Sequence, residues 1–249
     1  MDMTTIFGLI LGLGGIVVGN MIEGGDTSSL VQGAAAIIVL SGTLGAVLVS
    51  NKRRDINKAV RYTKEAFKQE TSGAAEKALS EIVDCARTAR KESILTLEPK
   101  ISSLSHPFLQ NVMRTVVDGI DPAIIRNIFE NQIHVEEEQE LAAAKVWNDA
   151  GGFSPTIGII GAVLGLIHVM GNLTDTSKLG TGIAVAFVAT IYGVGFANLI
   201  FIPIGNKLKR KAADNTKIKQ MILEGGLCIQ AGMTPGLTDI KLRPYIEKE

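Results

Sequence analysis

The chain has 249 residues, of which 46% are hydrophobic, 5% aromatic and 20% charged. Lysine plus arginine and aspartate plus glutamate each number 25, so no basic excess points to nucleic-acid binding. The two cysteines, Cys85 and Cys228, form no C-x-x-C pair, which excludes a disulfide scaffold or a cysteine zinc site. The histidines form no H-E-x-x-H motif, and no nucleophile–base pair or phosphate loop is visible. We therefore expect no metal site, no cofactor and no enzyme activity.

Four stretches are long and apolar enough to cross a bilayer as helices, which takes about 20 residues. No charged residue occurs in Met3–Ile22 or Thr27–Asn51. The third stretch covers residues 151–171 with one histidine, and the fourth covers residues 179–206. A signal peptide does not explain the first stretch, because the first lysine is Lys52 and a basic n-region is missing. The pattern predicts an all-α integral membrane protein with four transmembrane helices.

Basic residues cluster directly after the second and fourth stretches. Six lysines and arginines lie in residues 52–64 against Asp55, and six lie in residues 207–219 against Asp214. Cytoplasmic loops carry such an excess of basic residues. We therefore expect both clusters and both termini in the cytoplasm, with the short connections facing outward.

The insert between the second and third stretches has helical apolar spacing, with a break predicted at Thr71-Ser72-Gly73. Asp121-Pro122 is typical of an N-cap followed by a first-turn proline. We expect the helix that follows to continue through Trp147 toward the third stretch. Its acidic run, Glu136 to Glu140, is interpreted as a solvated face. One apolar face is expected to comprise Ile124, Ile125, Ile128, Phe129 and Ile133.

These features predict six segments in chain order. They are transmembrane helix 1 (1–22), transmembrane helix 2 (27–50), a cytoplasmic helical domain (51–150), transmembrane helix 3 (151–171), transmembrane helix 4 (179–206) and a cytoplasmic C-terminal tail (207–249). Small residues recur every fourth position at Gly8-x-x-x-Gly12, Gly15-x-x-x-Gly19 and Gly161-x-x-x-Gly165. This spacing lets helix backbones approach closely in lipid, so we expect these faces to pack against other helices.

The four stretches contain no aspartate, glutamate, lysine or arginine, although ion pathways usually contain intramembrane ionisable residues. His168 is interpreted as an interfacial or packed residue, with a proton relay as the less favoured alternative. If the protein conducts cations, another chain must supply the titrating carboxylate. Pro155 is compatible with the start of a helix, whereas Pro203 leaves a carbonyl without its helical donor, which lipid cannot replace.

The whole chain resembles the A subunit of the bacterial flagellar stator, the MotA/PomA family. The order and spacing of several motifs carry this resemblance. They are Gly12-Leu13-Gly14-Gly15, Ala89-Arg90-Lys91-Glu92-Ser93-Ile94-Leu95-Thr96-Leu97-Glu98, Asp118-Gly119, Ser154-Pro155-Thr156-Ile157-Gly158-Ile159-Ile160-Gly161, Thr190-Ile191-Tyr192-Gly193, Ile202-Pro203 and Gly232-Met233-Thr234-Pro235.

The resemblance implies a stator ion-channel subunit of the bacterial inner membrane that couples proton flow to torque on the rotor. It implies a pentamer of this chain around a MotB-like B subunit, whose membrane helix supplies an aspartate. Pro155, Thr190 and Pro203 would line or gate the ion path. Arg90 and Glu98 would contact a FliG-like torque-ring protein of the rotor; without the resemblance they are ordinary surface charges.

The residues at the matching ion-path positions bear on the coupling ion. Sodium-driven members of the family typically have threonine where this chain has Ala162, and a Thr-Thr pair where it has Ala189-Thr190. Sodium needs several oxygen ligands, whereas a proton needs only the carboxylate that it titrates. Because two of the three hydroxyls are absent, protons are predicted in preference to sodium.

Three alternatives remain: a sodium-driven stator subunit, an ExbB/TolQ-like energiser of outer-membrane processes, and a passive membrane scaffold. Energiser subunits have three crossings, so the paired first spans argue against them. A neighbouring reading frame for a single-span protein with a membrane aspartate and a peptidoglycan-binding domain would exclude the scaffold.

Overall fold

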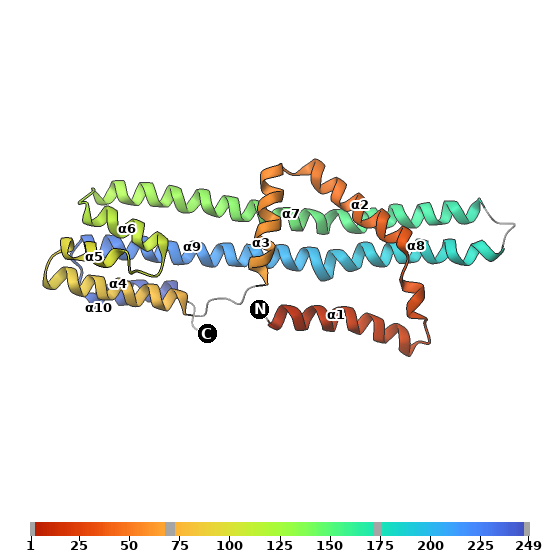
Figure 1. Ribbon diagram of the computed structural model, residues 1–249, viewed down its shortest axis with the longest axis horizontal. Helices are drawn as coiled ribbons and strands as arrows, with labels where there is room; N and C mark the ends of the chain where they lie inside the picture. Colours follow the sequence, from red (N-terminus) through yellow and green to blue (C-terminus); the bar gives the residue numbers. More distant parts are fainter. Residues whose placement is uncertain (1–2, 68–72, 172–175, 247–249) are drawn as a thin grey trace. The chain divides into compact units, whose positions relative to one another are not determined.

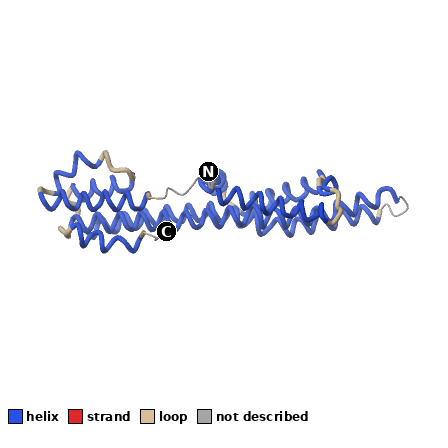
Figure 2. Tube along the Cα trace, turned by 90° about the horizontal axis from the view of Figure 1, so that it is seen from below, coloured by secondary structure: helices blue, strands red, loops and turns tan. Residues whose placement is uncertain are grey.

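The structure, a computed structural model, describes residues 3–67, 73–171 and 176–246. Every regular element within these residues is a helix (Figures 1 and 2). The all-α prediction is confirmed. The break predicted at Thr71-Ser72-Gly73 lies outside the described residues except for Gly73, which has a φ of 94° and precedes a helix.

The chain forms two compact units, each composed of two stretches of sequence. Unit 1 comprises residues 1–69 and 140–210, and unit 2 comprises residues 70–139 and 211–249. Two long helices, α7 (Pro122–Met170) and α9 (Ile202–Gln230), contribute residues to both units. Both ends of the predicted cytoplasmic insert therefore group with the apolar spans in unit 1.

Unit 1 holds the apolar helices. Besides its parts of α7 and α9 it contains α1 (Met3–Ile22), η1 (Thr27–Leu30), α2 (Gly33–Ser50), α3 (Arg53–Ala66), α8 (Thr176–Phe196) and the π-helical turn η3 (Ala197–Phe201). Four helical stretches among the described residues are long and apolar enough to cross a membrane, which confirms the prediction of four spans.

Two helices extend beyond the predicted boundaries. The helix capped by Asp121, whose Oδ1 accepts a hydrogen bond from the Ala123 amide at 2.8 Å, continues without interruption to Met170. The continuation through Trp147 is thus confirmed. Helix α9 begins inside the predicted fourth span and continues past residue 206 to Gln230.

Helices α7 and α8 pack with their backbones in close approach, through small residues on both sides (Figure 1). A Cβ added to Gly158 would lie 2.9 Å from the Ala189 carbonyl oxygen, and one added to Gly193 would lie 2.9 Å from the Gly158 Cα. A Cβ on Gly165 would likewise lie 2.9 Å from the Ala186 Cα. The expectation that Gly161-x-x-x-Gly165 packs against another helix is therefore confirmed.

The glycines of α1 behave differently. A Cβ on Gly12 would lie 3.0 Å from Leu199 Cδ2 of the π-helical turn, whereas Gly8, Gly15 and Gly19 have no neighbouring atom within 4 Å. Within the described residues, the packing expected for the α1 motifs is therefore found at Gly12 alone.

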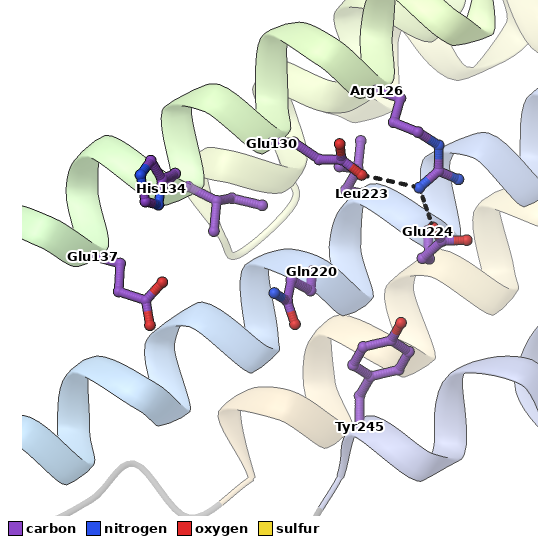
Figure 3. A pocket seen from close by; sticks show the side chains of 9 residues that line it. Arg126, Glu130, His134, Glu137, Gln220, Leu223, Glu224 and Tyr245 are labelled. Carbon is purple, nitrogen blue, oxygen red and sulfur yellow. Dashed lines mark hydrogen bonds and ion pairs between the residues drawn. The ribbon is translucent and has the colours of Figure 1, made fainter.

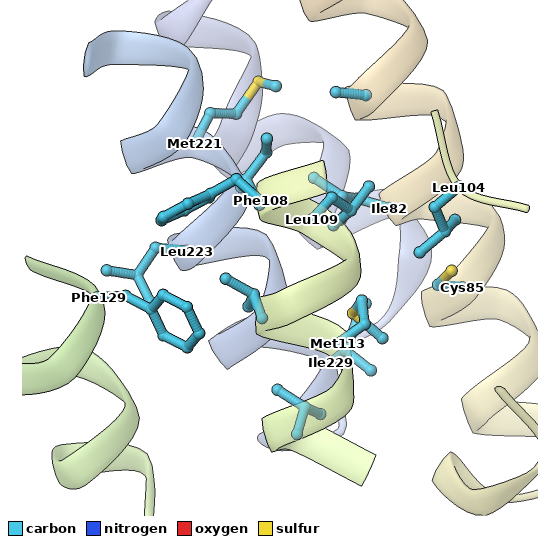
Figure 4. Packing of buried hydrophobic residues seen from close by; sticks show 14 of the residues in the cluster. Ile82, Cys85, Leu104, Phe108, Leu109, Met113, Phe129, Met221, Leu223 and Ile229 are labelled. Atoms are coloured by element: carbon cyan, nitrogen blue, oxygen red, sulfur yellow. The ribbon is translucent and has the colours of Figure 1, made fainter. Parts of the chain in front are cut away.

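Unit 2 is built around one apolar core (Figure 4). Besides its parts of α7 and α9 it contains α4 (Ala74–Lys91), η2 (Ile94–Leu97), α5 (Glu98–Ile101), α6 (Pro107–Val117), α10 (Pro235–Leu242) and η4 (Arg243–Tyr245). Ile82, Leu109 and Met221 are completely buried in this core. Gly225 and Gly226 allow α4 and α6 to pack close to α9, because an added Cβ would collide with Ile82 or Val112.

The apolar face predicted at the start of α7 is only partly buried. Ile125, Phe129 and Ile133 lie in the core, and Phe129 makes an edge-on contact with Phe108 at 5.3 Å between ring centroids. Ile124 and Ile128 remain about half exposed. Five apolar residues cover a wide arc of this helix, and unit 2 covers only one side of that arc.

We predict that replacing Gly158 by alanine destabilises the protein by about 1–3 kcal/mol, because the added methyl group meets backbone atoms that cannot move aside. The matched control is Gly152→Ala in the same helix, where nothing lies within 4 Å of an added Cβ. Thermal unfolding of the detergent-solubilised protein should show a lower Tm for the first variant and an equal or higher Tm for the second. Equal Tm values for both variants would contradict the close approach.

Candidate ion path and charged surfaces

The two proline-containing turns of the candidate ion path lie next to each other. Gly151, one turn before Pro155 in α7, packs against Ile202, the residue directly before Pro203. Pro155 lies inside α7, and because proline has no N–H, the Gly151 carbonyl receives no helical hydrogen bond there. Ser154 is fully buried, and its hydroxyl has no hydrogen-bond partner within the described chain. Unit 1 therefore brings backbone irregularities of the third and fourth spans together.

The irregularity near Pro203 is a π-helical turn at Ala197–Phe201. The Ile202 amide donates its hydrogen bond to the Ala197 carbonyl, five residues back rather than four. Such turns are rare, and they accommodate interruptions of the helical hydrogen-bond ladder such as a proline. The interruption of the helical hydrogen bonds expected at Pro203 is therefore accompanied by a local change of helix type.

The remaining candidate ion-path residues differ in their surroundings. Thr190 is half-buried, and its hydroxyl donates a 3.4 Å hydrogen bond to the Ala186 carbonyl of its own helix. Ala162 is half-buried, whereas Ala189 is completely buried and lies against Gly161. A larger side chain at position 189 would therefore displace its neighbours.

Tyr192 is a residue of this region that sequence analysis did not single out for its contacts. Its hydroxyl donates a 2.6 Å hydrogen bond to the Leu30 carbonyl and accepts one from the Gln32 amide at 3.2 Å. The two bonds hold the extended segment between η1 and α2 against the side of α8. The motif Thr190-Ile191-Tyr192-Gly193 was visible in the sequence, but its partner lies about 160 residues away.

The proposed rotor-contact residues lie on the surface of unit 2. Arg90 is exposed in the last turn of α4, and Glu98 is exposed at the start of α5. Neither side chain makes a hydrogen bond or ion pair within the residues that the structure describes. Between them, Leu97 is buried in the core and fixes the backbone of the segment. Both charges are therefore available to a partner, on a segment that Leu97 anchors to the core of unit 2.

A second charged surface surrounds an open hollow of about 440 Å³ between α7, α9 and η4 (Figure 3). Arg126 donates to Glu130 at 3.2 Å and to Glu224 at 2.7 Å, and Lys241 donates to the other Glu224 oxygen at 2.8 Å. Burial raises the pKa of Glu224, but the two cations outweigh it and hold that pKa below its usual value. The hollow is also lined by Ile133, His134, Glu137, Gln220, Leu223 and Tyr245.

The acidic run on α7 is only partly a solvated face. Glu138 is exposed, as expected, whereas half-buried Glu136 accepts hydrogen bonds from Lys219 at 2.7 Å and from Gln132 at 2.8 Å. Lys219 lies on α9, 83 positions along the chain, so the local sequence pattern could not reveal the pair.

The two cysteine thiols are buried. Burial raises the pKa of the Cys85 thiol to about 11, which keeps it protonated at neutral pH. Within the described part of the chain, no group of three or more histidine, cysteine, aspartate or glutamate residues could hold a metal ion. His168 is exposed in the last turn of α7.

We predict that Tyr192→Phe destabilises the protein by about 1–3 kcal/mol, because the Leu30 carbonyl and the Gln32 amide both lose their hydrogen-bond partner. Tyr245→Phe is the control, since that hydroxyl makes no hydrogen bond within the described residues. Thermal unfolding in detergent should separate the two variants, and a Tyr192→Phe protein as stable as the control would contradict the role of the hydroxyl.

Comparison with known proteins places the chain in a family. Residues 6–93 match the motility protein A N-terminal family, and residues 100–221 match the MotA/TolQ/ExbB proton channel family. A motility protein A of Bacillus subtilis is 32% identical over 99% of this chain and 91% of its own length.

Among solved structures, the C. jejuni MotAB structure contains a chain with a TM-score of 0.95 and 29% identity, covering 100% of this chain and 97% of that one. A chain of the Bacillus subtilis MotAB stator complex gives a TM-score of 0.90 and 32% identity over 99% and 96%. The chain therefore belongs to the motility protein A family of flagellar stator subunits.

Proposed function

We propose that this chain assembles with a MotB-like B subunit into a proton-driven stator of the flagellar motor. One observation carries the need for a partner: the four predicted spans, residues 3–22, 27–51, 151–171 and 179–206, contain no aspartate, glutamate, lysine or arginine. A channel built from this chain alone would lack a titrating carboxylate in the membrane. The two solved structures compared above are MotAB structures, which supports a second chain as the source of that group.

The proposed location is the bacterial inner membrane, with both termini in the cytoplasm. The basic clusters at residues 52–64 and 207–219 support this orientation. Unit 2 would then be cytoplasmic, where its exposed Arg90 and Glu98 can reach a FliG-like rotor protein. A ring of five copies around the B subunit would present these charges repeatedly to the rotor.

In this proposal, protons bind the partner's carboxylate beside the wall formed by α7 and α8. Ala162, Ala189 and Thr190 occupy the positions of this wall where sodium-driven members of the family typically have threonines. The protons are released past the adjoining turns of Pro155 and Pro203. Moving one charge through 100 mV supplies about 2.3 kcal/mol, enough to bias a step between equivalent subunit positions. Exposed ion pairs contribute about 0–1 kcal/mol each, which suits rotor contacts that must form and break at every step.

The preference for protons over sodium is supported by the small number of hydroxyls near the path. Ala189 is also completely buried, so this position serves helix packing. The match of residues 6–93 to the motility protein A N-terminal family supports a stator subunit over an ExbB/TolQ-like energiser.

We predict that Arg90→Asp abolishes swimming of a complemented strain while leaving the protein in the membrane at normal abundance, because it reverses an exposed charge that makes no hydrogen bond or ion pair within the described residues. The control is Arg87→Asp on the same helix, where the wild-type arginine already pairs with Asp84 at 2.6 Å. Swimming in soft agar and immunoblots of membrane fractions provide the two measurements. Normal swimming of the Arg90 variant would refute the rotor contact.

We predict that swimming speed of the complemented strain is unchanged when sodium is replaced by potassium and falls to zero with a protonophore. Tracking of single cells in both media measures this directly. Swimming that requires sodium and survives the protonophore would overturn proton coupling and favour a sodium-driven stator.

A further inference from the structure

The segment that carries Glu98 is held in unit 2 by two kinds of contact. Residues 94–105, called here the Glu98 segment, comprise η2, α5 and the turn that follows. On its inner side, Leu97, Ile101 and Leu104 are buried in the core. At its C-terminal end the contacts are polar, and they involve two titratable side chains.

The first polar contact comes from α4. The Glu81 carboxylate accepts hydrogen bonds from the Ser105 amide at 3.0 Å and from the Ser105 hydroxyl at 2.9 Å. Because Glu81 lies on α4, which also carries Arg90, this contact ties the end of the Glu98 segment to the helix that bears the other proposed rotor-contact charge.

The second polar contact is the N-cap of α6. Half-buried His106 accepts a 3.2 Å hydrogen bond at Nδ1 from the Phe108 amide, and Pro107 follows it as the first residue of the helix. Only a neutral imidazole can accept this bond, because a protonated imidazole carries a hydrogen on both nitrogens. A protonated His106 would also place a positive charge at the positive end of the α6 dipole.

We propose that Glu81 and His106 are positioning residues for Glu98, and that protonation of His106 at acidic cytoplasmic pH loosens the Glu98 segment. The role toward the rotor rests on the proposed function, whereas the opening of the cap is a property of unit 2 alone. The contact between Glu98 and the rotor would thereby weaken when the cytoplasm becomes acidic.

The charges around His106 set the direction of the effect. Burial and Lys219 of α9 lower the pKa of His106, while Glu81 of α4 and Glu136 of α7 oppose them only in part. A folded-state pKa below the ordinary value of about 6.5 means that the fold favours the neutral imidazole. The contribution of the cap is therefore complete above about pH 6.5 and is lost as the pH falls through the lower folded value.

The test is hydrogen–deuterium exchange of the full chain in detergent between pH 7.5 and 5.0, corrected for intrinsic exchange rates. In the wild type, the amides around Phe108 and the Glu98 segment should exchange about twofold to thirtyfold faster at the acidic end, the range expected for loss of an N-cap. His106→Asn should suppress this change, because asparagine caps a helix without titrating in this range. A wild type without pH dependence, or a His106→Asn protein with the same dependence, would overturn the proposal.

Two further variants separate the cap from other effects. His134→Asn removes an exposed histidine of α7 in the same unit and should retain the wild-type pH dependence. Glu81→Ala should accelerate exchange around Ser105 at every pH, since it removes a contact that does not depend on His106. If His134→Asn abolishes the pH response instead, the assignment to His106 is wrong.

The link to the rotor is tested in cells whose cytoplasm is acidified with a permeant weak acid. Wild-type swimming should slow more than that of the His106→Asn strain, at equal protein abundance. Equal slowing of both strains would overturn the link to rotor contact. The exchange result is independent of it, and failure of the proposed function would show instead as normal swimming of Arg90→Asp at neutral pH.

Discussion

The close approach of α7 and α8 is the constraint on which the membrane part of this protein depends. Lipid gives helices no hydrophobic reason to associate, so their contact relies on tight packing and on small residues that permit it. Gly158, Gly161 and Gly165 face Gly193, Ala189 and Ala186 with no room for a further carbon atom. The same packing leaves no space between these helices for a long acidic side chain. This tight packing agrees with the proposal that the ion-binding carboxylate belongs to a different polypeptide.

Unit 2 is stabilised by the hydrophobic effect rather than by close backbone packing in lipid. Its helices surround a core of aliphatic, aromatic and methionine side chains, and burial of these groups from water drives the packing. Its polar contacts, such as Glu136 with Lys219 and Arg126 with Glu224, join helices that the core has already brought together. Arg90 and Glu98 lie outside these pairs. Within the described residues, the unit thus displays these two charges without an intramolecular partner, on a surface backed by its core.

Much of the fold was predictable because its signals are local. The four charge-free stretches, the Asp121-Pro122 cap and the small-residue spacing at Gly161 and Gly165 each follow from a few neighbouring residues. The partial burial of the apolar face at Ile124–Ile133 was not predictable, because it depends on which side other helices cover. The same holds for Tyr192 and Leu30, which are 162 positions apart, and for the capping role of His106. Helices α7 and α9 each continue across a predicted segment boundary, at residues 150 and 206, since a change of polarity along a helix does not require a change of backbone conformation.

The π-helical turn at Ala197–Phe201 also determines the direction in which the following side chains point around the helix axis. Side chains of an α-helix advance by about 100° per residue, so one extra residue accommodated in a wider turn rotates everything that follows by about that angle. The contact of Ile202 with Gly151 depends on this offset. A deletion of a single residue within the turn would restore the ordinary helical phase and swing Ile202 and Pro203 away from the third span. Changes of length are therefore less tolerable at this point than changes of residue type, although the turn lies in a helix that otherwise looks uniform.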